Sequence, residues 1–197
     1  MVNVTLIATF YSTAPFMTAA LAFSPKRIIL LVDTMDPTIK SNISEVQKTF
    51  GGIAEVEAVK VLKDDIYDMA SKFVEQVDRQ AIKDNRIVVH VAGGKRTLAN
   101  GALYGCYARA DRIYRIVANK GDGNELAELP KLNYNLSTAK REVLTRISKR
   151  NQKTVAQIAK ELGKTKGMVY QHLRELKDAG YVDESFNITD AGRLALL

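Results

Sequence analysis

The sequence predicts an α/β fold in which a Rossmann-like, mostly parallel sheet carries helices on both faces and is followed by a small winged helix-turn-helix domain. Two patterns predict it. Over residues 1–118, runs rich in Val and Ile alternate with segments of helical periodicity, as in parallel strands joined by crossover helices. Over residues 154–182, two short amphipathic segments flank a glycine. We therefore place one domain at residues 1–132 and a second at residues 133–197.

Each element of the first domain follows from its composition and its place in this alternation. The apolar, β-branched runs predict five strands, at residues 2–8, 27–32, 54–61, 86–92 and 112–118. The segments between them predict four helices, at residues 15–23, 38–50, 64–83 and 96–109. A glycine turn at 121–123 then predicts a hairpin and an added strand at 125–129, and residues 130–136 connect the domains.

The second domain shows the pattern of two short helices with a tight turn between them, which predicts a helix-turn-helix. Its first helix repeats apolar side chains at i, i+3, i+4 and i+7, namely Val155, Ile158, Ala159 and Leu162. Gly163 predicts the turn, and the next helix turns inward Val169, Leu173 and Leu176. Gly180 predicts the end of that helix. Two short wing strands are expected at 181–182 and 186–189, and a terminal helix is expected to open with Thr189, Asp190 and Gly192.

The exposed face of the second helix carries side chains that suit a DNA major groove. Amide and guanidinium groups hydrogen-bond base edges, and lysines neutralise phosphates. The candidate DNA-binding residues, two of them in the wing, are Lys164, Thr165, Lys166, Tyr170, Gln171, Arg174, Ser185 and Asn187. The alternative is a helical pair that only packs against a partner chain. Residues 137–197 hold 12 Lys+Arg against 7 Asp+Glu, so +5 of the net +7 lies there, which favours double-stranded DNA as the partner.

Two loops of the first domain are candidates for binding a phosphate-bearing ligand. Ligands of open parallel sheets bind at the carboxyl ends of the strands, and both loops follow strands and lead into helices. Glycines let a backbone approach a phosphate, while amides at a helix start and cationic side chains attract it. The loop residues are Thr9, Phe10, Tyr11, Ser12 and Thr13 in the first, and Gly93, Gly94, Lys95, Arg96 and Thr97 in the second.

The spacing of these glycines argues against two common nucleotide sites. The chain lacks the Walker pattern of a P-loop, and no Gly-x-Gly-x-x-Gly follows the first strand, so ATP and nicotinamide chemistry are disfavoured. A glycine pair between a strand and a helix also has a purely steric explanation as a tight turn. From the residues alone, ligand binding and a plain structural turn both remain open.

The run VVHVAGGKRTLANGALYG at 88–105 and the run ELPKLNYNLS at 128–137, together with the pairing of the two domains, resemble the CRISPR-associated Rossmann-fold (CARF) regulators of archaea. The resemblance covers nearly the whole chain, and its most specific part is the loop at 92–97. This family more often has Thr or Ser where this chain has Ala92. The resemblance implies a homodimer that binds a cyclic oligoadenylate, expected to be cyclic tetra-adenylate, across its two-fold axis and binds DNA through its winged helices.

The resemblance also assigns roles to the loop residues. Gly94, Lys95, Arg96 and Thr97 are expected to contact phosphate or ribose, with Ser12 and Thr13 nearby. The ring of Phe10 or of Tyr11 is expected to stack on adenine, because aromatic faces accept a base in many orientations.

Two other functions stay open. A ring nuclease would cleave the cyclic ligand without a metal, with Ser12 and Lys95 as its candidate catalytic residues. A winged-helix regulator that responds to an ordinary metabolite would carry the same second domain.

Composition argues against a metal cofactor and a membrane location. Two histidines and one cysteine, far apart in the chain, do not form a zinc site, and the acidic residues Asp64, Asp65 and Asp68 suit a helix start. His90 is expected to be a core histidine. The lone Cys106 is expected to be a buried, inert thiol, and no apolar run is long enough to span a bilayer. We therefore expect no cofactor, no membrane partner and a cytoplasmic location.

Overall fold

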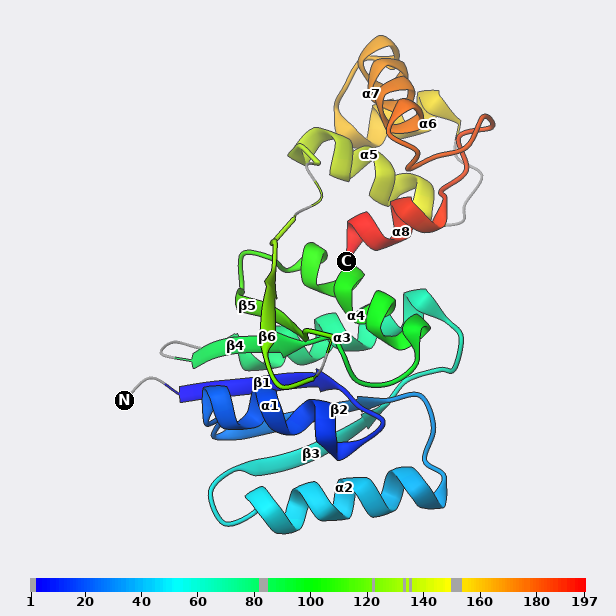
Figure 1. The fold of residues 1–197 in the computed structure, drawn as a ribbon. Helices are drawn as coiled ribbons and strands as arrows, with labels where there is room; N and C mark the ends of the chain where they lie inside the picture. Colours follow the sequence, from blue (N-terminus) through cyan, green and yellow to red (C-terminus); the bar gives the residue numbers. More distant parts are fainter. Residues whose placement is uncertain (1–2, 82–84, 122, 133, 135, 150–153) are drawn as a thin grey trace. The chain divides into compact units, whose positions relative to one another are not determined.

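The computed structural model describes residues 3–81, 85–121, 123–132, 134, 136–149 and 154–197. The chain divides into two compact units, Met1–Asn133 and Tyr134–Leu197. In Figure 1 the first unit runs from blue to green and the second from yellow-green to red. Each unit has an apolar core of its own.

The N-terminal unit is built on a six-stranded sheet with the strand order β3-β2-β1-β4-β5-β6. The first five strands along the chain pair in parallel, and β6 joins β5 in antiparallel fashion. The strands are β1 Asn3–Thr9, β2 Arg27–Val32, β3 Glu55–Lys60, β4 Asn85–His90, β5 Ile113–Asn119 and β6 Leu126–Leu129. The predicted Rossmann-like, mostly parallel sheet is confirmed.

Four helices connect the parallel strands and cover both faces of the sheet, as Figure 1 shows. They are α1 Thr13–Phe23, α2 Pro37–Phe50, α3 Ile66–Gln80 and α4 Arg96–Ala108. Their bounds differ from the predicted ones by at most three residues, and the predicted end of α3 at residue 83 lies outside the described residues. The largest corrections concern α3, which begins at Ile66 because the Asp65 side chain caps it by accepting a hydrogen bond from the Asp68 amide.

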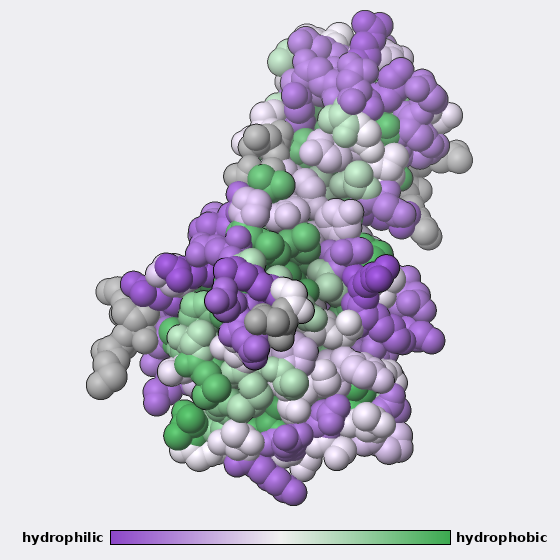
Figure 2. Space-filling model, in the orientation of Figure 1, coloured by the Kyte–Doolittle hydropathy of each residue, from purple (hydrophilic) through white to green (hydrophobic). Residues whose placement is uncertain are grey.

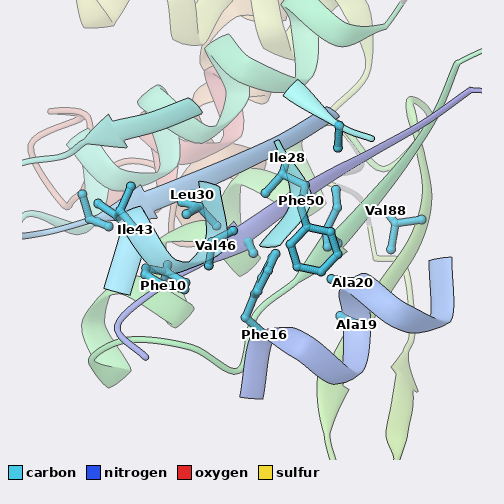
Figure 3. Close-up of a cluster of buried hydrophobic side chains, with 14 of the residues drawn as sticks. Phe10, Phe16, Ala19, Ala20, Ile28, Leu30, Ile43, Val46, Phe50 and Val88 are labelled. Carbon is cyan, nitrogen blue, oxygen red and sulfur yellow. The ribbon is translucent and has the colours of Figure 1, made fainter. Parts of the chain in front are cut away.

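The core lies in two layers, one on each side of the sheet. Alternate residues of β1 enter opposite layers, so that Leu6 and Ala8 pack with α1 and α2 while Ile7 packs with α3 and α4. Figure 3 shows the first layer, in which the ring of Phe16 points toward that of Phe50. The Phe16 ring meets the Phe10 ring edge-on at a centroid distance of 5.8 Å and the Phe50 ring at 6.0 Å.

The central position of Phe16 makes it the strongest single anchor of α1 against the sheet. Phe16→Ala should lower the free energy of unfolding of the N-terminal unit by about 3–5 kcal/mol, because it removes a fully buried ring and leaves a cavity. Urea denaturation followed by circular dichroism measures this. The control is Leu21→Ala in the same helix, where the side chain is 68% exposed and the change should stay within about 0.5 kcal/mol. Equal losses in the two variants would contradict this account of the core.

The C-terminal unit contains four helices, α5 Thr138–Ser148, α6 Val155–Leu162, α7 Lys166–Asp178 and α8 Asp190–Leu196. Of these, α5 was not predicted from the sequence. The helix is capped by Ser137, whose side chain accepts a hydrogen bond from the Lys140 amide, and it buries Val143 and Leu144 among the residues of α6 and α7. The signal for α5 in the sequence is the Ser-Thr pair that precedes this apolar pair.

The turns of this unit follow the predicted glycines, but the wing differs. Gly163, with φ 60°, ends α6, and Gly180, with φ 76°, follows α7. The wing has one isolated bridge between Val182 and Ile188 rather than two strands. The reason is a tight turn around Asp183, whose carboxylate accepts hydrogen bonds from the Ser185 and Asn187 amides.

Candidate functional site

The loops after β1 and β4 lie side by side at the carboxyl edge of the sheet. β1 and β4 are neighbours, although they are far apart in sequence, and the strand order reverses between them. In open α/β sheets this reversal leaves a crevice in which ligands bind. The fold therefore brings the two predicted loops to one place.

Gly93 sets how closely the two loops approach. A Cβ atom on Gly93 would lie 2.1 Å from the Thr9 carbonyl oxygen and 3.3 Å from the Phe10 Cα. Only a residue without a side chain fits this backbone contact. The following Gly94 has φ 85°, in the left-handed region, and this turns the chain into α4.

The two helices that follow these loops, α1 and α4, have amino ends without a side-chain cap, whereas α2 and α3 are capped by Asp36 and Asp65. Ser12 precedes α1 and Lys95 precedes α4, neither side chain accepts a capping hydrogen bond, and neither first turn contains an acidic residue. The helix dipole and the terminal amides therefore favour an anion. The side chain of Thr97, in the first turn of α4, adds a buried hydroxyl without a hydrogen-bond partner among the described residues.

Asp33 is a site residue that was not predicted from the sequence. It follows β2 directly, its side chain is 3% exposed, and its Oδ2 atom lies 3.2 Å from the Lys95 Nζ atom. The angles of this contact are not those of a hydrogen bond, so within the described part of the chain Oδ2 has an ion pair but no hydrogen-bond donor. The signal for Asp33 in the sequence is an acidic residue immediately after an apolar strand, because the carboxyl ends of the parallel strands meet at this edge.

The ring of Phe10 does not take the predicted stacking role. It is 1% exposed and packs on Phe16 in the core, which leaves no face for a base (Figure 3). Tyr11, the next residue, is 45% exposed and offers the free aromatic ring of this loop. The Tyr11 carbonyl accepts a hydrogen bond from Asn42 Nδ2 at 2.8 Å, which ties the loop to α2.

The other loop residues divide into buried and accessible groups. Thr9 is buried, and its hydroxyl lies 3.5 Å from the His90 carbonyl oxygen to which it donates, so its side chain faces the sheet rather than a ligand. Ser12 and Thr13 are partly exposed, and the side chains of Lys95 and Arg96 reach solvent. The accessible part of the site is therefore cationic and hydroxyl-bearing.

Groups behind the loops are not poised for proton transfer or nucleophilic attack. His90 is buried in β4, and burial lowers its pKa, while its Nε2 lies 2.7 Å from the Asn119 Oδ1. Burial raises the pKa of the Cys106 thiol well above its usual range, so this thiol is inert. No group of His, Cys, Asp or Glu residues in the described ranges is arranged to hold a metal ion.

The second candidate surface is the outer face of α7. Lys166, Tyr170, Gln171 and Arg174 are exposed there, while Val169, Leu173 and Leu176 are buried. In the view of Figure 2, the surface of this unit around α7 is predominantly hydrophilic. Gln171 also donates to Glu175, and a hydrogen bond from Lys140 lowers the pKa of that carboxyl.

Three other predicted DNA-binding residues have structural partners within the unit. Lys164 pairs with Glu142 at 3.0 Å and is only 19% exposed, so it fastens the turn to α5. Thr165 is the N-cap of α7, because its hydroxyl accepts from the Met168 amide. Asn187 donates through Nδ2 to Asp183 at 3.0 Å and stabilises the wing turn, whereas Ser185 is exposed.

A comparison with family models finds a match to the C-terminal part of the chain. The family described as "Bacterial regulatory protein, arsR family" matches residues 137–184, which include α5, α6 and α7. This region is therefore similar to the helix-turn-helix of that family, in agreement with the predicted helix-turn-helix. No curated protein sequence matches the chain significantly.

Solved structures share the fold at low identity. Can2 from Sulfobacillus thermosulfidooxidans, in complex with cyclic tetra-adenylate, aligns over 98% of this chain and 64% of its own, with a TM-score of 0.50 and 14% identity. Enterococcus italicus Csm6, bound to cyclic hexa-2′-fluoro-hexa-dAMP, aligns over 90% and 55%, with a TM-score of 0.53 and 10% identity.

Protein VC1899 from Vibrio cholerae aligns over 99% of this chain and 64% of its own, with a TM-score of 0.53 and 12% identity. The chain thus spans 55–64% of the length of these three proteins. The shared feature is the fold, and it agrees with the Rossmann-like prediction. Throughout the described segments, no helix is long and apolar enough to cross a membrane.

The contact between the two loops is open to a direct test. Gly93→Ala should destabilise the N-terminal unit by more than about 1 kcal/mol, because the new methyl group collides with the Thr9 carbonyl and the backbone must shift. The control is Gly121→Ala, where no heavy atom lies within 4 Å and the change should be within about 0.5 kcal/mol. Thermal unfolding monitored by circular dichroism compares them, and equal stability would show that the loops do not touch as described.

Proposed function

We propose that the protein is a homodimeric, DNA-binding transcriptional regulator whose N-terminal domain senses a cyclic oligoadenylate. The observation that carries this proposal is the meeting of two uncapped helix amino ends, Lys95 and Arg96 at the reversal point of the sheet. Such a site favours phosphates. The sequence resemblance to CARF regulators and the ligands of Can2 and Csm6 support a cyclic oligoadenylate, and cyclic tetra-adenylate is the form we favour.

Symmetry explains how one chain would recognise a ring. Two copies related by a two-fold axis present the same loops twice, and a ring of four identical nucleotides can share that axis. Each protomer would bind half of the ring, with Lys95, Arg96 and Thr97 at phosphate or ribose and the exposed ring of Tyr11 available to an adenine.

The C-terminal unit would convert ligand binding into a change of DNA affinity. The exposed face of α7 combines Lys166, Tyr170, Gln171 and Arg174. A dimer reads two half-sites whose separation must match the distance between its recognition helices. If the ligand changes the packing of the protomers, it changes that distance and therefore the affinity for paired half-sites.

The cationic pair of the site provides the main test. Lys95→Ala combined with Arg96→Ala should weaken binding of cyclic tetra-adenylate by at least about a hundredfold, because each side chain supplies a charge-assisted hydrogen bond to phosphate. Isothermal titration calorimetry measures the affinity. The matched control is Lys26→Ala combined with Lys48→Ala, which removes the same charge from exposed positions at the opposite edge of the sheet. Undiminished binding by the Lys95/Arg96 variant would refute the proposed site.

Incubation of cyclic tetra-adenylate with the wild-type protein and with Ser12→Ala separates a sensor from a ring nuclease. If the protein is a sensor, chromatography of the nucleotides after prolonged incubation should recover the cyclic tetra-adenylate uncleaved. Linear products that disappear in Ser12→Ala would instead establish the nuclease.

Arg174 provides the test of the DNA face. Arg174→Ala should lower affinity for a mixed-sequence DNA duplex and reduce the slope of log affinity against log salt concentration by about 0.9 for each phosphate that the variant no longer neutralises. Fluorescence anisotropy over a salt series gives both quantities. Arg193→Ala is the control, because it removes one positive charge from α8, where Arg193 pairs with Asp190. A wild-type slope in the Arg174 variant would exclude this face from DNA contact.

A further inference from the structure

The carboxylate of Asp33 is the one feature of the ligand site that does not suit a phosphate. It follows β2 and lies against the end of the Lys95 side chain, with Oδ2 3.2 Å from the Lys95 Nζ atom, and it would repel a second anion. Separation of Lys95 from Asp33 is unfavourable, because a buried carboxylate without a counter-charge costs several kcal/mol. The site therefore combines a cation that attracts phosphate with a fixed acid beside it.

The hydrogen bonding of Asp33 indicates what this acid accepts. The residue is 5% exposed, and among the described residues its Oδ2 atom has no hydrogen-bond donor. A buried acceptor without a donor is unfavourable, and a ligand that supplies a donor removes that cost. The part of the ligand nearest Asp33 must therefore be a hydrogen-bond donor without negative charge.

The geometry of a nucleotide identifies this donor. Lys95 binds the phosphate in the proposed function, and Asp33 contacts Lys95 directly. In a 3′,5′-linked ribonucleotide the 2′-hydroxyl is on the carbon next to the one that carries the phosphate, whereas the amino group of adenine lies on the far side of the base. The donor that comes close to Lys95 together with a phosphate is the 2′-hydroxyl.

We propose that Asp33 accepts a hydrogen bond from a ribose 2′-hydroxyl and makes the site selective for ribonucleotide rings over deoxyribonucleotide rings. This inference rests on the proposed function. Lys95 neutralises the Asp33 carboxylate and contacts the phosphate. The two residues therefore bind adjacent groups of one nucleotide, Lys95 the phosphate and Asp33 the 2′-hydroxyl. In a symmetric dimer two Asp33 residues would read two of the hydroxyls of the ring.

The test compares cyclic tetra-adenylate with its 2′-deoxy analogue on the full chain. The wild type should bind the ribo ring at least about tenfold more tightly, because the analogue cannot donate the hydrogen bond to the charged carboxylate. Asp33→Ala should abolish this preference, and Asp33→Asn, which keeps an acceptor oxygen of the same shape, should retain part of it. Glu57→Ala, which removes an exposed acid from β3, should keep the wild-type preference.

The outcomes distinguish this inference from the function on which it rests. If neither ring binds the wild type, the proposed function is wrong. If the wild type binds both rings equally, or if folded Asp33→Ala keeps the ribose preference, the role of Asp33 is wrong while ligand sensing stands. An equal gain in affinity for both rings in Asp33→Ala would also overturn it, because that result describes a counter-ion of Lys95 alone. Circular dichroism verifies folding, and Asp33→Asn decides the question if Asp33→Ala does not fold.

Discussion

The close contact between the loop after β4 and the loop after β1 is the constraint on which the site depends. Gly93 packs against the Thr9 carbonyl with no room for a side chain. This contact fixes where α4 begins and therefore where its amino end and Lys95 lie. It works together with the Phe10 ring, which anchors the first loop in the core through Phe16. The candidate site is thus held by apolar packing of Phe10 in the core and by the backbone contact between the two loops.

Charge at this edge is balanced rather than simply positive. Two helix amino ends and the side chains of Lys95 and Arg96 favour an anion, while the buried Asp33 carboxylate opposes one. A site for phosphate alone would gain affinity without the acid. Its presence next to Lys95 is understandable if the ligand has an uncharged donor beside its phosphate, as a ribonucleotide has.

The C-terminal unit separates residues that build the fold from residues that are free to meet a partner. Lys164, Thr165 and Asn187 hold the turn, the helix start and the wing through partners within the unit. Lys166, Tyr170 and Arg174 have side chains on the exposed face of α7. All of these residues have polar groups, so residue type does not distinguish the two sets. They differ in whether the side chain holds a structural partner within the unit or lies on the exposed face of α7. The arsR-type match includes α5, which provides both the core partner of α7 and the acid that pairs with Lys164.

Local patterns in the sequence are sufficient to predict the alternation of strands and helices, the parallel sheet, the helix-turn-helix and the two glycine positions that end its helices. These features depend on local periodicity and turn chemistry, which a single chain displays directly. Three features emerge only in the folded chain: the Phe10 ring is buried while Tyr11 is exposed, Lys164 pairs with Glu142, and Asp33 pairs with Lys95. Each of these depends on residues distant in sequence that meet across strands or helices. Burial and pairing of that kind leave no periodic signal in the sequence, because they are set by the order of the strands and the direction of each side chain.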